Sequence, residues 1–258
     1  MSQGLYIGSM GMMTYMRRLD THANNIANAQ TTGFKADFLT TKPIANHTMY
    51  RQDDGGRTGI GNEDYAVMSA RVYSKLQPGA MQITNSPTDL MLEDGMEGNT
   101  SFFVVEQNGE SMLTRNGHFG VNEEGYLKTE TGSYVLDVNN NHIQVPSGTK
   151  VGVTAEGYLY DVNTGKNIAQ LQTRSVSAAA SDQLVKHENA GFTLDGMQIG
   201  NLPSGTAKVH NYMLEASNVD MTKEMAEVMT NQRSIQASQR IMTSFDKIYE
   251  KEANELVK

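Results

Sequence analysis

The chain contains no cysteine and no tryptophan, and only 5 of its 258 residues are proline. Without cysteine there is no disulfide, no thiolate zinc site and no cysteine nucleophile. No apolar run reaches the ~18 residues that a membrane-spanning helix needs. The first twenty residues lack a basic start followed by an unbroken apolar stretch, so we expect no classical secretory signal and, if the chain leaves the cytoplasm, another export route.

Basic charge is also scarce. The 21 Lys and Arg residues are outnumbered by 29 Asp and Glu residues, which gives a net charge of −8. A protein that binds a phosphate backbone usually presents a basic surface, so we expect no nucleic-acid partner. The length allows a sizeable core and one to three domains.

Patterns that carry chemistry are missing as well. None of the six histidines has metal-motif spacing such as His-Glu-x-x-His, and there is no Gly-x-Ser-x-Gly elbow. The acidic pairs Asp53–Asp54 and Glu123–Glu124 lie in turn-like segments, whereas a catalytic pair is held across a cleft. We therefore predict no catalytic residue, no metal, no cofactor and no enzyme activity.

Apolar residues recur every seven positions at both ends of the chain. Those near the start are Leu5, Met12, Leu19 and Ile26, and those near the end are Met221, Val228, Ile235, Met242, Tyr249 and Leu256. A sustained period of seven keeps one seam of a helix facing partner helices. The second seam of the C-terminal repeat is poor, because its members are Glu224, Asn231, Ser238, Phe245 and Glu252.

An ordinary amphipathic helix docked on its own domain is the alternative explanation of the C-terminal repeat. Residues 230–240 favour contact with other helices, because they are rich in amide and hydroxyl side chains and poor in charge. We predict one helix over residues 4–28, which ends before a positive φ at Gly33. A second helix is predicted over residues 218–256, with capping residues at positions 217–220.

The middle of the chain has a different character. Residues 36–80 are predicted to be an extended connector, with breaks at Pro43 and Pro78 and a glycine-rich loop at 55–61 that lacks the ending of a phosphate loop. Residues 81–205 are predicted to be β. Phe102–Val105 is a buried-strand run, and Asn108–Gly109 is a strong hairpin signal. Residues 120–127 and 152–159 resemble each other, which predicts two similar hairpins.

The expected fold is therefore mixed α and β. Long terminal helices form a coiled-coil-like pair, and the middle domain is all-β, rich in hairpins and shaped like a barrel or a sandwich. We divide the chain into a helix and motif at 1–35, a connector at 36–80, a β domain at 81–210 and a second helix at 211–258.

Three motifs resemble those of bacterial flagellar rod and hook proteins. The first is Ala-Asn-Asn-Ile-Ala-Asn, a polar link and Gly-Phe-Lys, which here comprises Ala23, Asn24, Asn25, Ile26, Asn28, Gly33, Phe34 and Lys35. The second is Glu-x-Ser-Asn-Val-Asp before a long helix, with Ser217, Asn218, Val219 and Asp220. The third is Leu-Thr-Arg-Asn-Gly-His-Phe at residues 113–119, with Leu where the family commonly has Tyr.

The resemblance implies an axial structural subunit of the flagellar basal body. Its terminal helices would line a tube and its β domain would face outward. Export through the flagellar type III apparatus would need no cleaved signal peptide. The partners would be copies of itself and other rod or hook proteins. The amides of Asn24, Asn25 and Asn28 would bond across subunits and fix their register.

The modest β insert favours a rod protein, proximal or distal, over a larger hook protein. A hook or hook-like subunit is the first alternative. A stand-alone enzyme or carbohydrate-binding β domain is the second.

Overall fold

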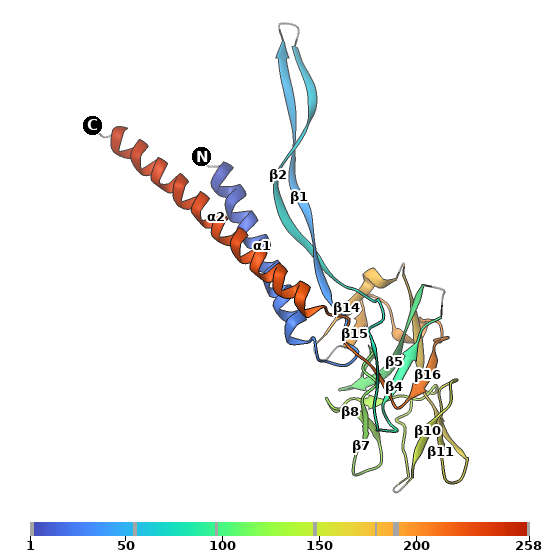
Figure 1. Cartoon of the computed structure of the whole chain (residues 1–258). Coiled ribbons are helices and arrows are strands. Elements are labelled where there is room, and N and C mark those ends of the chain that lie inside the picture. Colours follow the sequence, from blue (N-terminus) through green and yellow to red (C-terminus); the bar gives the residue numbers. More distant parts are fainter. Residues whose placement is uncertain are drawn as a thin grey trace. The chain divides into compact units, whose positions relative to one another are not determined.

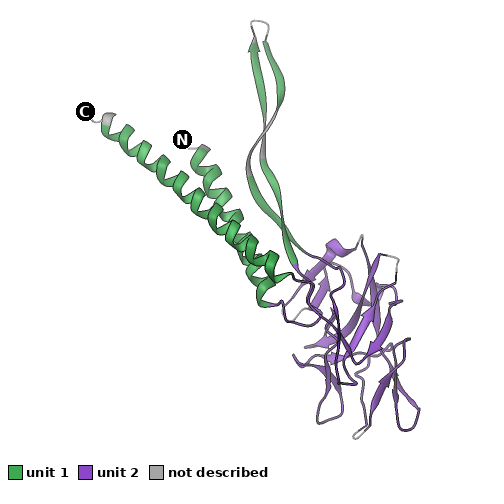
Figure 2. Ribbon diagram, in the orientation of Figure 1, with its two compact units in different colours: residues 1–27, 37–73, 220–258 green, residues 28–36, 74–219 purple. Residues whose placement is uncertain are grey.

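The computed structural model describes residues 3–53, 56–95, 98–146, 149–178, 180–187 and 191–256. The chain divides into two compact units, which are coloured separately in Figure 2. Unit 1 contains residues 1–27, 37–73 and 220–258, and unit 2 contains residues 28–36 and 74–219. A helix at each end and a β-rich middle confirm the predicted mixed α and β class.

Unit 1 contains both helices. Helix α1 spans Gln3–Ala27 and helix α2 spans Met221–Leu256, and the two lie side by side (Figure 1). Gly4 and Gly8 of α1 lie against Phe245 and Met242 of α2, so small residues let the helices approach closely there. Asp220 caps α2, because its Oδ1 accepts hydrogen bonds from the backbone N–H groups of residues 222 and 223.

Unit 1 also contains a long hairpin, which we call the arm. It consists of β1 (Asp37–Asp53) and β2 (Gly56–Ser74), which pair only with each other within the described residues (Figure 1). The break expected at Pro43 is wrong, because β1 continues through it; each strand of a two-stranded ribbon has a free edge that needs no proline N–H. The loop expected at 55–61 is wrong from Gly56 onward, because that segment is part of β2. Of the turn-like pair Asp53–Asp54, Asp53 is the last residue of β1 and Asp54 lies outside the described residues.

Unit 2 is built from short strands. The largest sheet has the order β14-β15-β6-β5-β9-β8-β7, and β13 also pairs with β5. Its strands are β5 (Asn99–Gln107), β6 (Glu110–Thr114), β7 (Phe119–Val121), β8 (Leu127–Thr129), β9 (Tyr134–Val135), β13 (Thr173–Ser177), β14 (Leu184–Lys186) and β15 (Gly191–Leu194).

Within the described part of unit 2, three smaller sheets accompany the largest one. One has the order β10-β11-β12, from Val151–Val153, Tyr158–Asp161 and Asn167–Gln170. The other two pair β4 (Leu90–Glu93) with β16 (Lys208–Asn211), and β3 (Met81–Ile83) with β17 (Met213–Glu215). The strands that precede α2 in the sequence are therefore integrated into unit 2.

Strand β5 is buried on both faces, because successive side chains of a strand point to opposite sides. Phe103 and Val105 belong to one apolar cluster with Leu127 and Leu159. Phe102 and Val104 belong to a second cluster with Phe192. This arrangement confirms the interpretation of residues 102–105 as a buried strand.

The predicted hairpins are confirmed. Asn108 and Gly109 have φ values of 54° and 85°, and they join β5 to β6. The two halves of the internal repeat fold alike. In the first, the backbone N–H of Gly125 donates to the carbonyl oxygen of Asn122; in the second, that of Gly157 donates to Thr154. These turns close the hairpins β7–β8 and β10–β11.

Candidate functional site

Three charged side chains from distant parts of the sequence meet inside unit 2. Lys35, Arg115 and Glu215 have side chains that are about 1% exposed. Lys35 Nζ lies 2.5 Å from Glu215 Oε1, and Arg115 Nε lies 2.6 Å from Glu215 Oε2. One carboxylate therefore joins the end of the first motif, the middle motif and the start of the last motif. We call these residues, with Asp94, the charge cluster.

Every charged group of the cluster has further polar partners. Arg115 Nη2 lies 2.7 Å from Asp94 Oδ2, and its guanidinium also donates to the carbonyl oxygens of Leu92 and Ser101. Lys35 Nζ donates to the carbonyl oxygen of Gln77. Such saturation is what allows buried charge in a folded protein, because a buried charge without partners costs several kcal/mol.

The cluster shifts the pKa values of its members. Burial works to raise the pKa of Glu215, but the charges of Arg115 and Lys35 outweigh it, and the pKa of Glu215 is lowered. Burial works to lower the pKa of Arg115, but hydrogen bonds and charges from Asp94 and Glu215 outweigh it and raise the pKa. For Lys35, burial is the largest effect and the pKa is lowered despite Glu215. Opposite charges thus decide the directions at Glu215 and Arg115, and desolvation decides it at Lys35.

Gly33 is required at its position for two separate reasons. Its φ is +67°, as predicted, and a Cβ there would collide with the backbone of Arg115 and Asn116. Its N–H donates to the carbonyl oxygen of Glu215 at 2.7 Å. The first motif therefore touches the backbone of both other motifs.

Asn218 connects three segments of unit 2 through its amide. Its Oδ1 accepts from the N–H of Ala36 at 2.7 Å, and its Nδ2 donates to the carbonyl oxygens of Lys75 and Gln77 at 2.8 and 2.9 Å. Phe34, which precedes Ala36 by two residues, is buried. Lys186 Nζ lies 3.4 Å from the centroid of the Phe34 ring. Ser217 accepts a hydrogen bond from the N–H of Val219, which is half-buried.

Asn25 has its partners inside the chain. Its side chain is fully buried; its Nδ2 donates to the carbonyl oxygen of Asp37 at 2.8 Å, and its Oδ1 accepts from the N–H of Asp37 at 2.9 Å. Asn28 Oδ1 accepts from the hydroxyl of Thr31. Ala23 and Asn24 are exposed. Asn25 and Asn28 therefore both have hydrogen-bond partners within the subunit.

The α1 side of α2 contains members of both seams. Val228, Ile235 and Met242 of the predicted seam are half-buried, whereas its ends at Met221 and Tyr249 are exposed. The side chain of Leu256 lies outside the described residues. On α1, all four members of the predicted seam are half-buried: Leu5, Met12, Leu19 and Ile26.

The seam that looked poor in the sequence makes direct contacts with α1. Glu224 Oε2 lies 2.5 Å from His22 Nδ1, and Phe245 packs on Gly4. Asn231 is the most buried residue of α2, and its Nδ2 has no hydrogen-bond partner within the described chain. The seven-residue apolar pattern alone could not predict these contacts, because a helix also buries polar side chains when its partner helix can form hydrogen bonds with them.

Sequence reasoning named Lys35 and Gly33 but missed the charge cluster. Arg115 and Glu215 lay inside recognised motifs. Each is a charged residue next to apolar residues of a strand, and this pattern could have indicated a buried charge. Asp94 carried no signal, and Gly79 was noted only as part of the expected break at residues 77–79. Gly79 donates its N–H to Glu215 Oε1, and a Cβ at Gly79 would collide with the carbonyl oxygen of Ala216.

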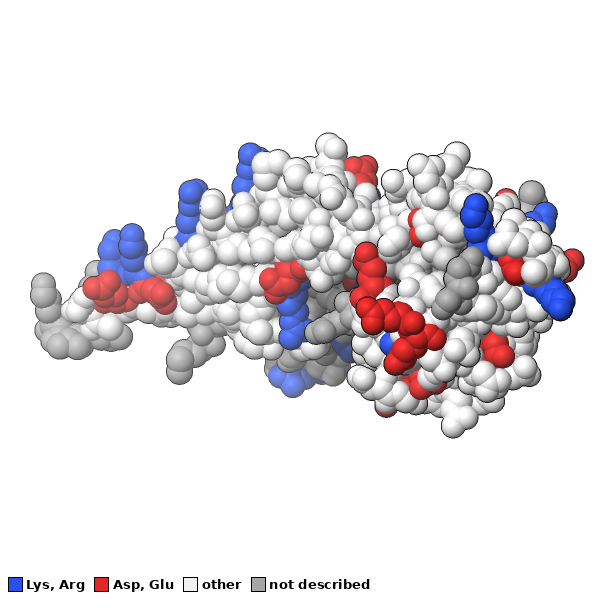
Figure 3. All heavy atoms as spheres, turned by 90° about the horizontal axis from the view of Figure 1, so that it is seen from below, with Lys and Arg blue, Asp and Glu red and all other residues white. Residues whose placement is uncertain are grey.

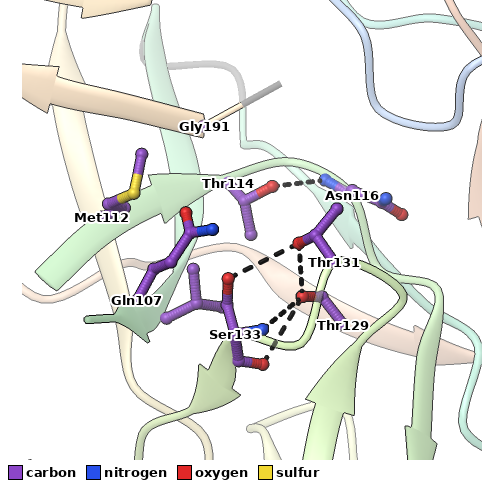
Figure 4. Close-up of a pocket in the computed structure, with 9 residues that line it drawn as sticks. Gln107, Met112, Thr114, Asn116, Thr129, Thr131, Ser133 and Gly191 are labelled. Atoms are coloured by element: carbon purple, nitrogen blue, oxygen red, sulfur yellow. Dashed lines mark hydrogen bonds between the residues drawn. The ribbon is translucent and has the colours of Figure 1, made fainter. Parts of the chain in front are cut away.

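A pocket of about 20 Å³ lies elsewhere in unit 2 (Figure 4). Hydroxyl and amide side chains line it, including Gln107, Thr129, Thr131 and Ser133. Such a volume holds about one water molecule and is too small for a substrate. Within the described ranges, no three His, Asp or Glu side chains gather as metal ligands.

The fold brings the three motifs together at one buried cluster in unit 2. A family model described as "Flagella basal body rod protein" matches residues 5–35. "Flagellar hook protein FlgE/F/G D1 domain" matches residues 95–160, and "Flagellar basal body rod FlgEFG protein C-terminal" matches residues 210–256.

Full-length relatives are similar over almost the whole chain. The flagellar basal-body rod protein FlgF of Caulobacter vibrioides is 32% identical over 246 residues, which cover 94% of this chain and 93% of that protein. The flagellar basal-body rod protein FlgG of Bacillus subtilis is 29% identical over 269 aligned positions, which cover 98% of this chain and 99% of that protein.

The chain belongs to the flagellar basal-body rod protein family. It is a structural subunit of the rod, located in the flagellar basal body of the cell envelope. Neither described helix is long and apolar enough to cross a membrane.

Proposed function

We propose that the subunit joins the rod through the exposed faces of its helix pair, and that α1 and α2 act as one coiled-coil-like element lining the axial tube. The observation that carries this proposal is the set of large apolar side chains left exposed on both helices. They are Tyr6, Met13 and Met16 on α1, and Met225, Met229, Ile241 and Ile248 on α2. Their spacing places them away from the residues through which the two helices contact each other.

The composition of this surface supports helix contacts. Figure 3 shows one face of the whole molecule, on which separate groups of charged side chains stand among uncharged ones. Residues 230–240 contribute amides and hydroxyls, which can bond to a neighbour without the cost of burying charge. The partners would be further copies of this chain and other axial proteins of the basal body.

In this proposal, the terminal segments of unit 1 assemble and unit 2 is an outward-facing, barrel- or sandwich-like spacer. The charge cluster holds residues 28–36 and the strand before α2 together within that spacer, and we expect it to keep these segments folded when torque passes between subunits. Delivery through the flagellar type III export apparatus is part of this proposal, because the chain belongs to the rod protein family. The protein would have no catalytic activity of its own.

A matched pair of variants tests the assembly surface. Met229→Asp places a charge on the exposed apolar side of α2, whereas Met229→Leu keeps an apolar side chain at the same position. Basal bodies purified from cells that express Met229→Asp should lack the subunit, and those with Met229→Leu should retain it. Normal incorporation of Met229→Asp would rule out this surface.

Electron microscopy of basal bodies carrying a labelled subunit tests the position along the axis. Label on the rod supports the proposal. Label confined to the hook would support the alternative hook subunit.

A further inference from the structure

The arm is attached to α1 by three side chains on one side of the helix. The hydroxyl of Thr14 lies 3.1 Å from the carbonyl oxygen of Val67 in β2, and shares its proton with the carbonyl oxygen of Met10. Arg17 Nη1 donates to Ser69 Oγ of β2 at 2.5 Å. Asn25 makes its two hydrogen bonds with the backbone of Asp37, the first residue of β1.

Two of the three side chains on α1 and one acceptor on the arm are buried, whereas Arg17 is exposed. Thr14 is 6% exposed, Ser69 is 8% exposed, and Asn25 is fully buried. The apolar side chains of the arm, by contrast, point largely into solvent: Phe38, Met49, Tyr50, Ile60, Val67 and Val72 are all exposed. A two-stranded hairpin on its own is marginally stable in water, so its contacts with α1 carry much of its stability.

Helix α1 keeps its contacts with the arm apart from its contacts with α2. At about 100° per residue, Thr14, Arg17 and Asn25 lie within about 80° of one another around the helix. Gly4, Gly8 and His22, which contact α2, are centred about 100° further round. One side of α1 binds α2, a second binds the arm, and a third carries the exposed side chains of Tyr6, Met13 and Met16.

We propose that Thr14, Arg17 and Asn25 are positioning residues that hold the root of the arm along α1 in the single subunit, before any other chain binds. The contacts of these side chains with the arm predict that the direction of the arm relative to α1 is set by the chain itself and not by neighbours in an assembly. The inference goes beyond the proposed function and does not depend on it, because it concerns the isolated chain.

Distance measurements between spin labels on the full-length chain test this inference. The chain contains no cysteine, so Asp20→Cys on α1 and Ile60→Cys on β2 give two unique labelling sites, both exposed. In the otherwise wild-type monomer we expect a single narrow distribution of distances. Thr14→Val combined with Arg17→Ala should broaden it at least twofold while the helical circular dichroism stays constant.

Three further variants make the result specific. Ser69→Ala removes the acceptor on the arm without altering α1, and it should broaden the distribution in the same direction. Arg17→Lys keeps a donor and should restore much of the narrow distribution. Arg18→Ala is the matched control, because Arg18 lies over the ring of Tyr15. An unchanged distribution in the Thr14/Arg17 variant, or equal broadening in Arg18→Ala, would overturn the inference.

Discussion

Lys35 and Glu215 are 180 positions apart in the sequence, yet their side chains form a 2.5 Å ion pair that is about 1% exposed. The same carboxylate binds Arg115 through its other oxygen. The folded state of unit 2 therefore contains a segment from near each end of the chain, and the residues just before α2 are a structural part of the β domain.

Replacing Glu215 by Gln should destabilise unit 2 by about 3–5 kcal/mol at pH 7. The variant leaves Lys35 and Arg115 buried with only Asp94 to balance them, and an uncompensated buried charge costs about this much. Chemical denaturation followed by near-UV circular dichroism measures the change. Glu110→Gln is a suitable control, because Glu110 is exposed at the start of β6. A loss below 1 kcal/mol would contradict the assigned role of the cluster.

The loss of stability caused by Glu215→Gln should depend on pH. The folded-state pKa of Glu215 is lowered, so its contribution to stability is complete above the unfolded-state value of about 4.3 and is lost as the pH falls through the folded value. The stability difference between wild type and Glu215→Gln should therefore be largest near neutral pH and shrink below about pH 4. A difference that is constant from pH 7 to pH 3 would show that ionisation of Glu215 is not what stabilises the fold.

Gly33→Ala should cost more than an ordinary glycine substitution at positive φ. Strain at φ > 0 costs about 1–3 kcal/mol, and at Gly33 the added Cβ also collides with the backbone of Arg115 and Asn116. Gly132 is the matched control, because its φ is +86° and a Cβ there meets open space. Thermal unfolding should show a larger loss for Gly33→Ala than for Gly132→Ala. Equal losses would mean that the backbone around Gly33 relaxes freely.

Asn231→Leu should stabilise the helix pair of the isolated subunit by about 1 kcal/mol or more. Asn231 is 4% exposed and its Nδ2 has no partner within the described chain, and a buried unsatisfied donor costs about 1–3 kcal/mol. Thermal melting followed at 222 nm tests this, with Gln232→Leu at an exposed position as control. If Asn231→Leu melts earlier than wild type, the amide has a partner in solution. A stabilised variant that assembles poorly would indicate that Asn231 sets the helix register.

Ile235→Asp should destabilise the helix pair and leave the β core of unit 2 unchanged. Ile235 is half-buried on the α1 side of α2, so a carboxylate there costs several kcal/mol unless the helices part. Hydrogen exchange should speed up along α1 and α2, while amides of Val104 and Leu113 in unit 2 stay protected. The exposed Gln236→Asp should leave both regions unchanged. Loss of protection at Val104 and Leu113 would show that the helix pair is needed for the β core.

The sequence by itself determined the local elements. A seven-residue period of apolar residues located both helices, an Asn-Gly pair located a hairpin, and a continuous apolar run located the buried strand at 102–105, because these features depend on neighbours along the chain. Gly33 was predicted for the same reason. The arm was misjudged, since glycine and proline, which usually break structure, are tolerated in a ribbon whose strands have free edges.

Only the tertiary structure decided how the distant pieces are used. Nothing local to Glu215 indicates that it meets Lys35 and Arg115, because a buried ion pair depends on three segments reaching one point in a medium of low dielectric. The polar seam of α2 became an internal contact for a similar reason: His22 of α1 satisfies Glu224. Asn25 bonds to the start of the arm rather than being left free for a neighbour. The role of a charged or hydrogen-bonding side chain depends on its partner in the folded chain, and a linear pattern does not specify that partner.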